Sequence, residues 1–104
     1  MVALMPEEDK PDSRLARAHV FISGMVQGVF FRAHTRTRAN FLNIKGWVRN
    51  TTTGGVEAVF EGEKENVEKI IEFCKKGPYG ADVESIDVKW EKFRAEFKDF
   101  KIKY

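Results

Sequence analysis

The chain has 104 residues, the size of one domain, and its 18 lysines and arginines nearly balance its 16 acidic residues. A formal net charge of +2 gives no indication of a nucleic-acid-binding protein, and the mixed charges are typical of a solvated surface. The single cysteine, Cys74, excludes an internal disulfide and a Cys-x-x-Cys metal pair, which fits a reducing cytosol. No segment resembles a signal peptide or a transmembrane helix. We therefore expect a cytoplasmic protein of one domain, without a membrane partner.

The first half of the chain predicts a tail, a strand and a helix. Residues 1–14 contain two prolines and four acidic residues without hydrophobic periodicity, so we expect a flexible tail before a domain at residues 15–104. Alternating apolar residues predict a strand at residues 16–23. After a loop with two glycines, residues 31–42 predict a helix. Its apolar stripe comprises Phe31, Thr35, Ala39 and Leu42.

The second half predicts a hairpin, a second helix and two further strands. Residues 44–50 and 56–61 flank a turn rich in threonine and glycine, which is typical of a hairpin. Residues 63–76 have the clearest helical periodicity in the chain and end at a Gly-Pro stop signal. Alternation then predicts strands at residues 83–91 and 97–104. The apolar stripe of the second helix comprises Val67, Ile70, Ile71 and Cys74.

The order of these elements is β-α-β-β-α-β with an extra C-terminal strand. One face of the sheet must bury two amphipathic helices, which predicts an α+β fold: a two-layer sandwich of the ferredoxin-like, split βαβ kind. We expect a mostly antiparallel sheet with both helices on one face. The acidic run from Glu61 to Glu65 is expected to form an exposed turn at a helix start. This fold serves many unrelated functions, so function must be argued from a site.

The segment between the first strand and the first helix is the strongest indication of a site. Residues 24–32 read Gly-Met-Val-Gln-Gly-Val-Phe-Phe-Arg, with two glycines four residues apart. Glycine permits positive φ, so the backbone can curl until N–H groups and the positive helix end face one point. Arg32, in the first turn of the helix, could then grip two oxygens of a phosphate. The residues predicted to bind phosphate through their backbone are Met25, Val26, Gln27, Gly28, Val29 and Phe30.

Other chemistry-bearing residues are few. The sequence has no His or Cys cluster for a transition metal, no Asp-rich run for magnesium and no nucleophile elbow. His19 and His34 are interpreted as surface or packing residues, and Cys74 as a core residue. Asn50, at the end of the second predicted strand, is either a turn former or a polar group of the site.

Taken together, these residues resemble the acylphosphatase signature, and the resemblance extends over residues 17–104. The residues that carry it are Gly24-x-Val26-Gln27-Gly28-Val29-x-Phe31-Arg32, Gly46-Trp47-Val48-x-Asn50 and Gly54-x-Val56. The resemblance implies that Arg32 binds phosphate and that Asn50 positions a water molecule.

The resemblance also implies an enzyme that hydrolyses small acyl phosphates to a carboxylate and inorganic phosphate, without a metal or cofactor. Inorganic phosphate and sulfate would compete as anions, and we expect a monomer. The alternative is a regulatory module on the same fold that binds phosphate without turnover. An RNA-binding domain is disfavoured, because no Lys/Arg-Gly-aromatic motif is present.

Overall fold

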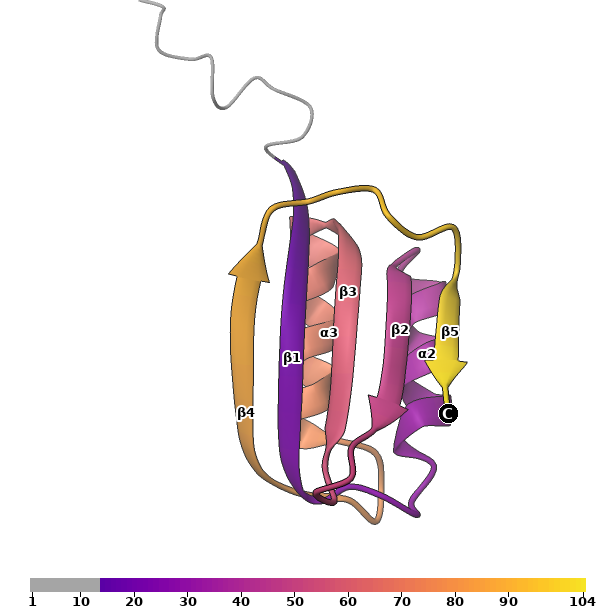
Figure 1. Cartoon of the computed structure of the whole chain (residues 1–104), viewed down its shortest axis with the longest axis vertical. Helices are drawn as coiled ribbons and strands as arrows, with labels where there is room; N and C mark the ends of the chain where they lie inside the picture. The colour runs from indigo at the N-terminus through magenta and orange to yellow at the C-terminus, as the bar shows by residue number, and fades with distance from the viewer. Residues whose placement is uncertain (1–13) are drawn as a thin grey trace, which may run out of the picture.

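The computed structural model describes residues 14–104, so the predicted tail at residues 1–14 lies, apart from Arg14, outside the described residues. Both helices cover one face of a single five-stranded sheet (Figure 1), which confirms the predicted α+β sandwich. Among the described residues, no helix is both long and apolar enough to cross a membrane. The elements are β1 (Leu15–Met25), α2 (Phe31–Phe41), β2 (Lys45–Asn50), β3 (Val56–Glu63), α3 (Lys64–Lys76), β4 (Asp82–Glu91) and β5 (Phe100–Lys103).

The strands lie in the order β4-β1-β3-β2-β5. The β1 strand pairs antiparallel with both β3 and β4, so Ala18 lies between Phe60 and Trp90. The β2 strand pairs antiparallel with β3 and parallel with β5. Because the N-terminal end of α2 and the ends of β2 and β5 lie at one end of the sheet (Figure 1), residues far apart in sequence meet there.

The core lies between the sheet and the two helices. Strand residues such as Val20 and Phe60 are fully buried against the predicted helical stripes, of which Phe31 and Ile70 are members. Cys74 is also fully buried, and burial raises the pKa of its thiol to about 12. A thiol in this environment is protonated at neutral pH, which confirms its interpretation as a core residue rather than a nucleophile.

The predicted C-terminal strand begins too early. Residues 97–99 belong to a connection from β4 to β5 that crosses one end of the sheet (Figure 1), and β5 begins at Phe100. The two strands it joins are the opposite edges of the sheet, so the connection must span the three strands between them. Alternation alone could not show where this crossing ends.

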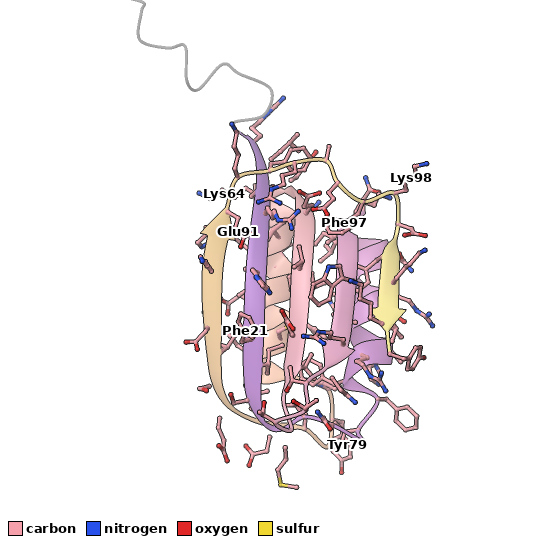
Figure 2. The ribbon with its side chains drawn as sticks, in the orientation of Figure 1. Phe21, Lys64, Tyr79, Glu91, Phe97 and Lys98 are labelled. Carbon is pink, nitrogen blue, oxygen red and sulfur yellow. The ribbon has the colours of Figure 1, made fainter. Side chains whose placement is uncertain are left out.

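The prediction of an exposed acidic turn is wrong for Glu61, whose exposed fraction is only 1%. Its carboxylate accepts hydrogen bonds from Nη1 of Arg17 (3.1 Å) and from the backbone N–H groups of Arg94 (2.8 Å) and Glu96 (2.9 Å). Arg17 also donates to Glu91 and Glu96. Glu61 therefore holds the β4–β5 connection against the sheet face opposite the helices, the face turned toward the viewer in Figure 2.

Candidate active site

The conformation of the loop between β1 and α2 depends on its two glycines. Gly24 lies at a register shift between β1 and β4, where a Cβ atom would come within 2.2 Å of the carbonyl oxygen of Asp82. Gly28 has φ +78° and open space around it, so its backbone conformation rather than crowding favours glycine. The predicted positive φ angles at both glycines are confirmed.

The first turn of α2 offers free hydrogen-bond donors. Phe30 occupies the N-cap position, where no side chain caps the helix, and the turn contains no acidic residue. Within residues 14–104, none of the N–H groups of residues 27–30 donates to a backbone carbonyl. The first N–H groups of a helix have no intrahelical acceptor, so this end of α2 presents a positive potential and unpaired donors.

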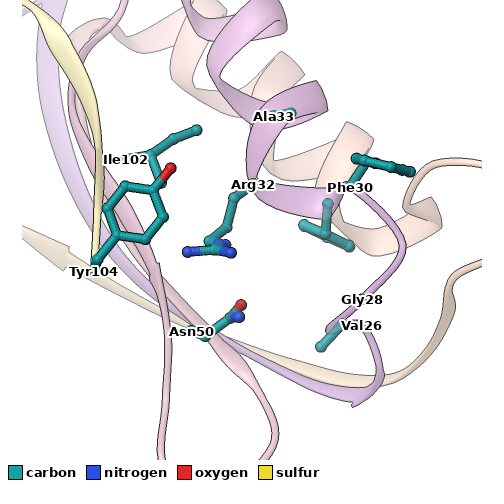
Figure 3. Close-up of a pocket in the computed structure, with 9 residues that line it drawn as sticks. Val26, Gly28, Phe30, Arg32, Ala33, Asn50, Ile102 and Tyr104 are labelled. Carbon is teal, nitrogen blue, oxygen red and sulfur yellow. The ribbon is translucent and has the colours of Figure 1, made fainter.

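Arg32 and Asn50 line one pocket at this helix end, with a volume of about 290 Å³. The guanidinium of Arg32 comes down from the first turn of α2 and the amide of Asn50 comes up from the end of β2, so the two groups face each other (Figure 3). The other residues that line the pocket are Val26, Gly28, Phe30, Phe31, Ala33, Ile102 and Tyr104.

Three residues of the predicted phosphate loop line this pocket and three do not. Val26, Gly28 and Phe30 belong to the lining. Met25 is the last residue of β1, paired with Asp82, and its side chain is exposed. Val29 packs against the hydrophobic core. The side chain of Gln27 has a separate structural role.

The side chain of Gln27 joins the glycine loop to the turn that follows Asn50. Its Nε2 donates to the carbonyl oxygens of Thr51 (2.9 Å) and Gly55 (2.8 Å). The turn is closed by its own bonds, since Thr51 N–H donates to the Gly55 carbonyl and Gly55 N–H donates to Thr51 Oγ1. This contact could not be predicted from the sequence. A glutamine between two loop glycines signals only that a polar side chain is available.

The electrostatics of the pocket depend on one charged side chain, because among residues 14–104 Arg32 is the only lining residue with a charged side chain. Its guanidinium carbon lies 5.0 Å from the centre of the Tyr104 ring. No carboxylate of the described residues forms a salt bridge with Arg32. An unneutralised guanidinium beside free N–H groups is a site for an anion with several oxygens.

Neither histidine lines this pocket. His19 lies on the face opposite the helices, where its Nε2 is 2.6 Å from Oε2 of Glu57, and His34 is an exposed residue of α2. Over the described part of the chain, no three His, Cys, Asp or Glu side chains gather into a group that could hold a metal ion.

Comparison with known proteins decides the family. The sequence model of the acylphosphatase family matches residues 18–102. The chain is 51% identical to an acylphosphatase of Pelotomaculum thermopropionicum over 89 residues, which cover 86% of this chain and 97% of that protein. It is 55% identical to an acylphosphatase of Pyrobaculum aerophilum over 89 residues, or 85% of this chain and 94% of the relative.

The chain belongs to the acylphosphatase family. The resemblance inferred from the sequence is thereby confirmed, as is its assignment to the acylphosphatase class of enzymes. The fold agrees, because an acylphosphatase structure from Coxiella burnetii superimposes with a TM-score of 0.83 at 34% identity, covering 88% of this chain and 96% of that one. The matched segment, residues 18–102, includes both Arg32 and Asn50.

Proposed function

We propose that this acylphosphatase hydrolyses small acyl phosphates to a carboxylate and inorganic phosphate, with Arg32 holding the phosphate and Asn50 positioning the attacking water. The observation that carries the proposal is the pairing of these two side chains across one pocket at the uncapped start of α2. The reaction matches what the family and its named relatives catalyse.

In the proposed complex, the phosphate lies against the backbone N–H groups of residues 25–30 and those of the first turn of α2. Arg32 supplies a fork of donors whose geometry matches two phosphate oxygens. Phosphoryl transfer passes through a transition state with charge spread over the equatorial oxygens, so most of the catalysis consists of positioning and electrostatic stabilisation.

Asn50 suits the water-positioning role because its amide carries both an acceptor and two donors. Either end of the amide can hold the water, so the side chain can orient it with little contact to the phosphate. A water held in line with the departing carboxylate has already lost its translational entropy on binding, so this loss does not add to the barrier of the reaction.

The leaving group explains why so few side chains suffice. The conjugate acid of a carboxylate has a pKa of about 4 to 5, so the carboxylate departs without a proton from the enzyme. A phosphate oxygen of the substrate can accept the proton of the attacking water. The proposed steps therefore use Arg32, Asn50 and backbone N–H groups, and none of them needs a general acid, a general base or a metal ion.

The experiment that tests this function is release of inorganic phosphate from acetyl phosphate in excess EDTA. We expect full activity in the chelator and competitive inhibition by phosphate and sulfate. Activity that disappears in EDTA and returns with Mg²⁺ would contradict the mechanism. Phosphate binding without any turnover would favour the regulatory module.

We also propose a cytoplasmic monomer that acts on a small molecule and not on nucleic acid. Size-exclusion chromatography tests the oligomeric state.

Substitution of Asn50 separates catalysis from binding. Loss of one preorganised polar contact to the reacting centre typically lowers kcat by about 10²–10³, and we expect this for Asn50→Ala with little change in inhibition by phosphate. Asn50→Asp should be at least as impaired, because a carboxylate beside an anionic substrate is repulsive. If Asn50 only forms the turn, Asp would retain activity, since it is also a good turn residue. Steady-state kinetics and melting temperatures of both variants decide between these roles.

A further inference from the structure

Phe30 has a conformation and an exposure that folding alone does not explain. Its φ of 60° and ψ of 24° place it in the left-handed region, which is a true outlier for a bulky side chain. Its exposed fraction is 77%, and as the N-cap residue it makes no side-chain hydrogen bond to α2. Glycine or asparagine would fit this backbone better. Strained backbone of this kind concentrates at ligand sites, which agrees with the place of Phe30 in the predicted phosphate loop. The exposed ring is then free to contact a ligand held by that loop.

Tyr104 lies on the other side of Arg32 from Phe30, as Figure 3 shows. It is fully exposed at the end of β5 and forms part of the same pocket lining. Ala33 of α2 and the half-buried Ile102 of β5 complete this part of the lining. Beyond Arg32 and Asn50, the pocket is therefore walled by apolar and aromatic side chains.

We infer that this apolar wall is the subsite for the acyl group, and that the enzyme prefers acyl phosphates with a bulky apolar acyl group, ring-shaped or branched. The inference rests on the proposed function. With the phosphate against Arg32 and the loop N–H groups, the acyl group is covalently attached one oxygen away and must occupy the remaining part of the pocket. Apolar acyl groups gain free energy there by leaving water.

The same wall discriminates against charged acyl groups. An acyl chain that ends in a second carboxylate gains nothing from contact with Phe30 and Ile102, and beyond Arg32 the lining offers it no cationic side chain. The expected order of preference is thus a bulky apolar acyl group first, a small one second and a dicarboxylic one last.

The test compares cyclohexanecarbonyl, acetyl and succinyl phosphate as substrates of the whole chain. The first two release alkyl carboxylates of similar acidity, so their chemical reactivity is similar and the enzyme's contacts decide the difference. One added apolar group in a pocket typically changes kcat/KM by about 10–200-fold. Because both aromatic rings are exposed, we expect the low end, about tenfold in favour of the cyclohexane ring, and mainly through a lower KM.

Phe30→Gly is the informative variant. It removes the ring and permits the left-handed backbone, so the ratio of kcat/KM between cyclohexanecarbonyl and acetyl phosphate should fall toward one without a lower melting temperature. Using the ratio cancels any effect of the substitution on phosphate binding. Phe41→Ala is the matched control: Phe41 ends the same helix, is 81% exposed and lies outside the pocket, so the ratio should stay unchanged.

Tyr104→Ala is a second variant, and it should also lower the ratio. A wild-type ratio near one, or a ratio that both variants retain, overturns the inference while hydrolysis of all three substrates still supports the proposed function. No hydrolysis of any acyl phosphate would instead overturn the proposed function, and the acyl subsite with it.

Discussion

The guanidinium of Arg32 is held by its neighbour rather than by a counter-charge. The guanidinium carbon lies over the Tyr104 ring, 5.0 Å from its centre, in a cation–π contact that leaves the N–H donors available to the pocket. A carboxylate in the same place would neutralise the charge that an anionic substrate needs. The aromatic contact therefore leaves the positive charge of Arg32 free for the proposed phosphate.

Substitution of Arg32 should reduce catalysis strongly. Arg32→Ala removes up to two charge-assisted hydrogen bonds, each worth about 1.5–3 kcal/mol, and kcat/KM should fall by about 10²–10⁴. Arg32→Lys should recover only part of the loss, because an ammonium group cannot reproduce the planar fork. Steady-state kinetics with acetyl phosphate measure both effects.

Arg38→Ala is the control for this substitution. Arg38 lies on the same helix and also stacks on an aromatic ring, that of Phe73 at 5.0 Å, but it lies outside the pocket. We expect near-normal turnover for this variant. Near-normal turnover of Arg32→Ala would mean that Arg32 is not the phosphate ligand.

At the scale of elements, the proposed site depends on the relative position of two loops. One loop enters α2 and leads to Arg32, and the other leaves β2 just after Asn50. The two hydrogen bonds from Gln27 connect them directly. A shift of one loop would change the distance between the proposed positions of the phosphate and the attacking water, and misplacement on the order of 1 Å can lower the rate about 10²-fold.

Gln27→Ala should therefore impair turnover although its side chain is outside the pocket lining. We expect kcat to fall by about tenfold to 10²-fold, with a small loss of stability, because each lost hydrogen bond is worth about 0.5–1.5 kcal/mol. Gln27→Glu should be no better, since a carboxylate cannot donate to two carbonyl oxygens. Thr52→Ala, an exposed residue of the same turn, is the control. A normal kcat in Gln27→Ala would show that the two loops keep their relative position without these hydrogen bonds.

The elements themselves could be predicted because their signals are local. Both helical stripes are buried as expected except at Leu42, which is half-buried just after the end of α2. The alternation in residues 16–23 correctly assigns Ala18, Val20 and Ile22 to the core face. The resemblance to the acylphosphatase signature singled out Arg32 and Asn50 as predicted site residues, and their catalytic roles stay predictions. Their meeting across one pocket then follows from the positions of α2 and β2 in the fold.

Two features that could not be predicted from the sequence involve partners distant along the chain. The alternation along β3 predicts an exposed side chain at Glu61. The β4–β5 connection, more than 30 positions later in the sequence, covers this side chain and donates two backbone hydrogen bonds to it. Gln27 likewise finds its acceptors at least 24 positions away. No feature of the sequence predicted the left-handed conformation of Phe30, because bulky residues rarely adopt it.

At the scale of the whole molecule, the sheet face opposite the helices links stability to pH. Glu57 on β3 contacts His19 of β1 at 2.6 Å and accepts a hydrogen bond from Nε of Arg49 on β2 at 2.7 Å. Burial alone would raise the pKa of Glu57, but the bonds from His19 and Arg49 outweigh burial and lower it. A hydrogen bond from Arg17 likewise lowers the pKa of Glu91, which faces His19 from β4.

Both carboxylates therefore stabilise the fold above the pKa of the unfolded chain, about 4.3 for Glu, and this contribution is lost as the pH falls further. Glu57→Gln should lower the melting temperature at pH 7, and its difference from the wild type should shrink below about pH 4. Thermal denaturation between pH 3 and 8 measures this difference, with the exposed Glu68→Gln as the control. A difference that is the same at every pH would contradict the role of the ionised carboxylate.

The position of β1 between β3 and β4 also determines the order in which this chain can fold. During synthesis β1 emerges first among the strands, but its partners are residues 56–63 and 82–91, and its Arg17 pairs with Glu91, 74 positions later. Contacts of such long sequence separation form slowly, because the chain must lose loop entropy before it gains any pairing. On the ribosome, β1 remains an unpaired apolar strand until most of the domain has been translated. The nascent chain is therefore most exposed to aggregation in that interval.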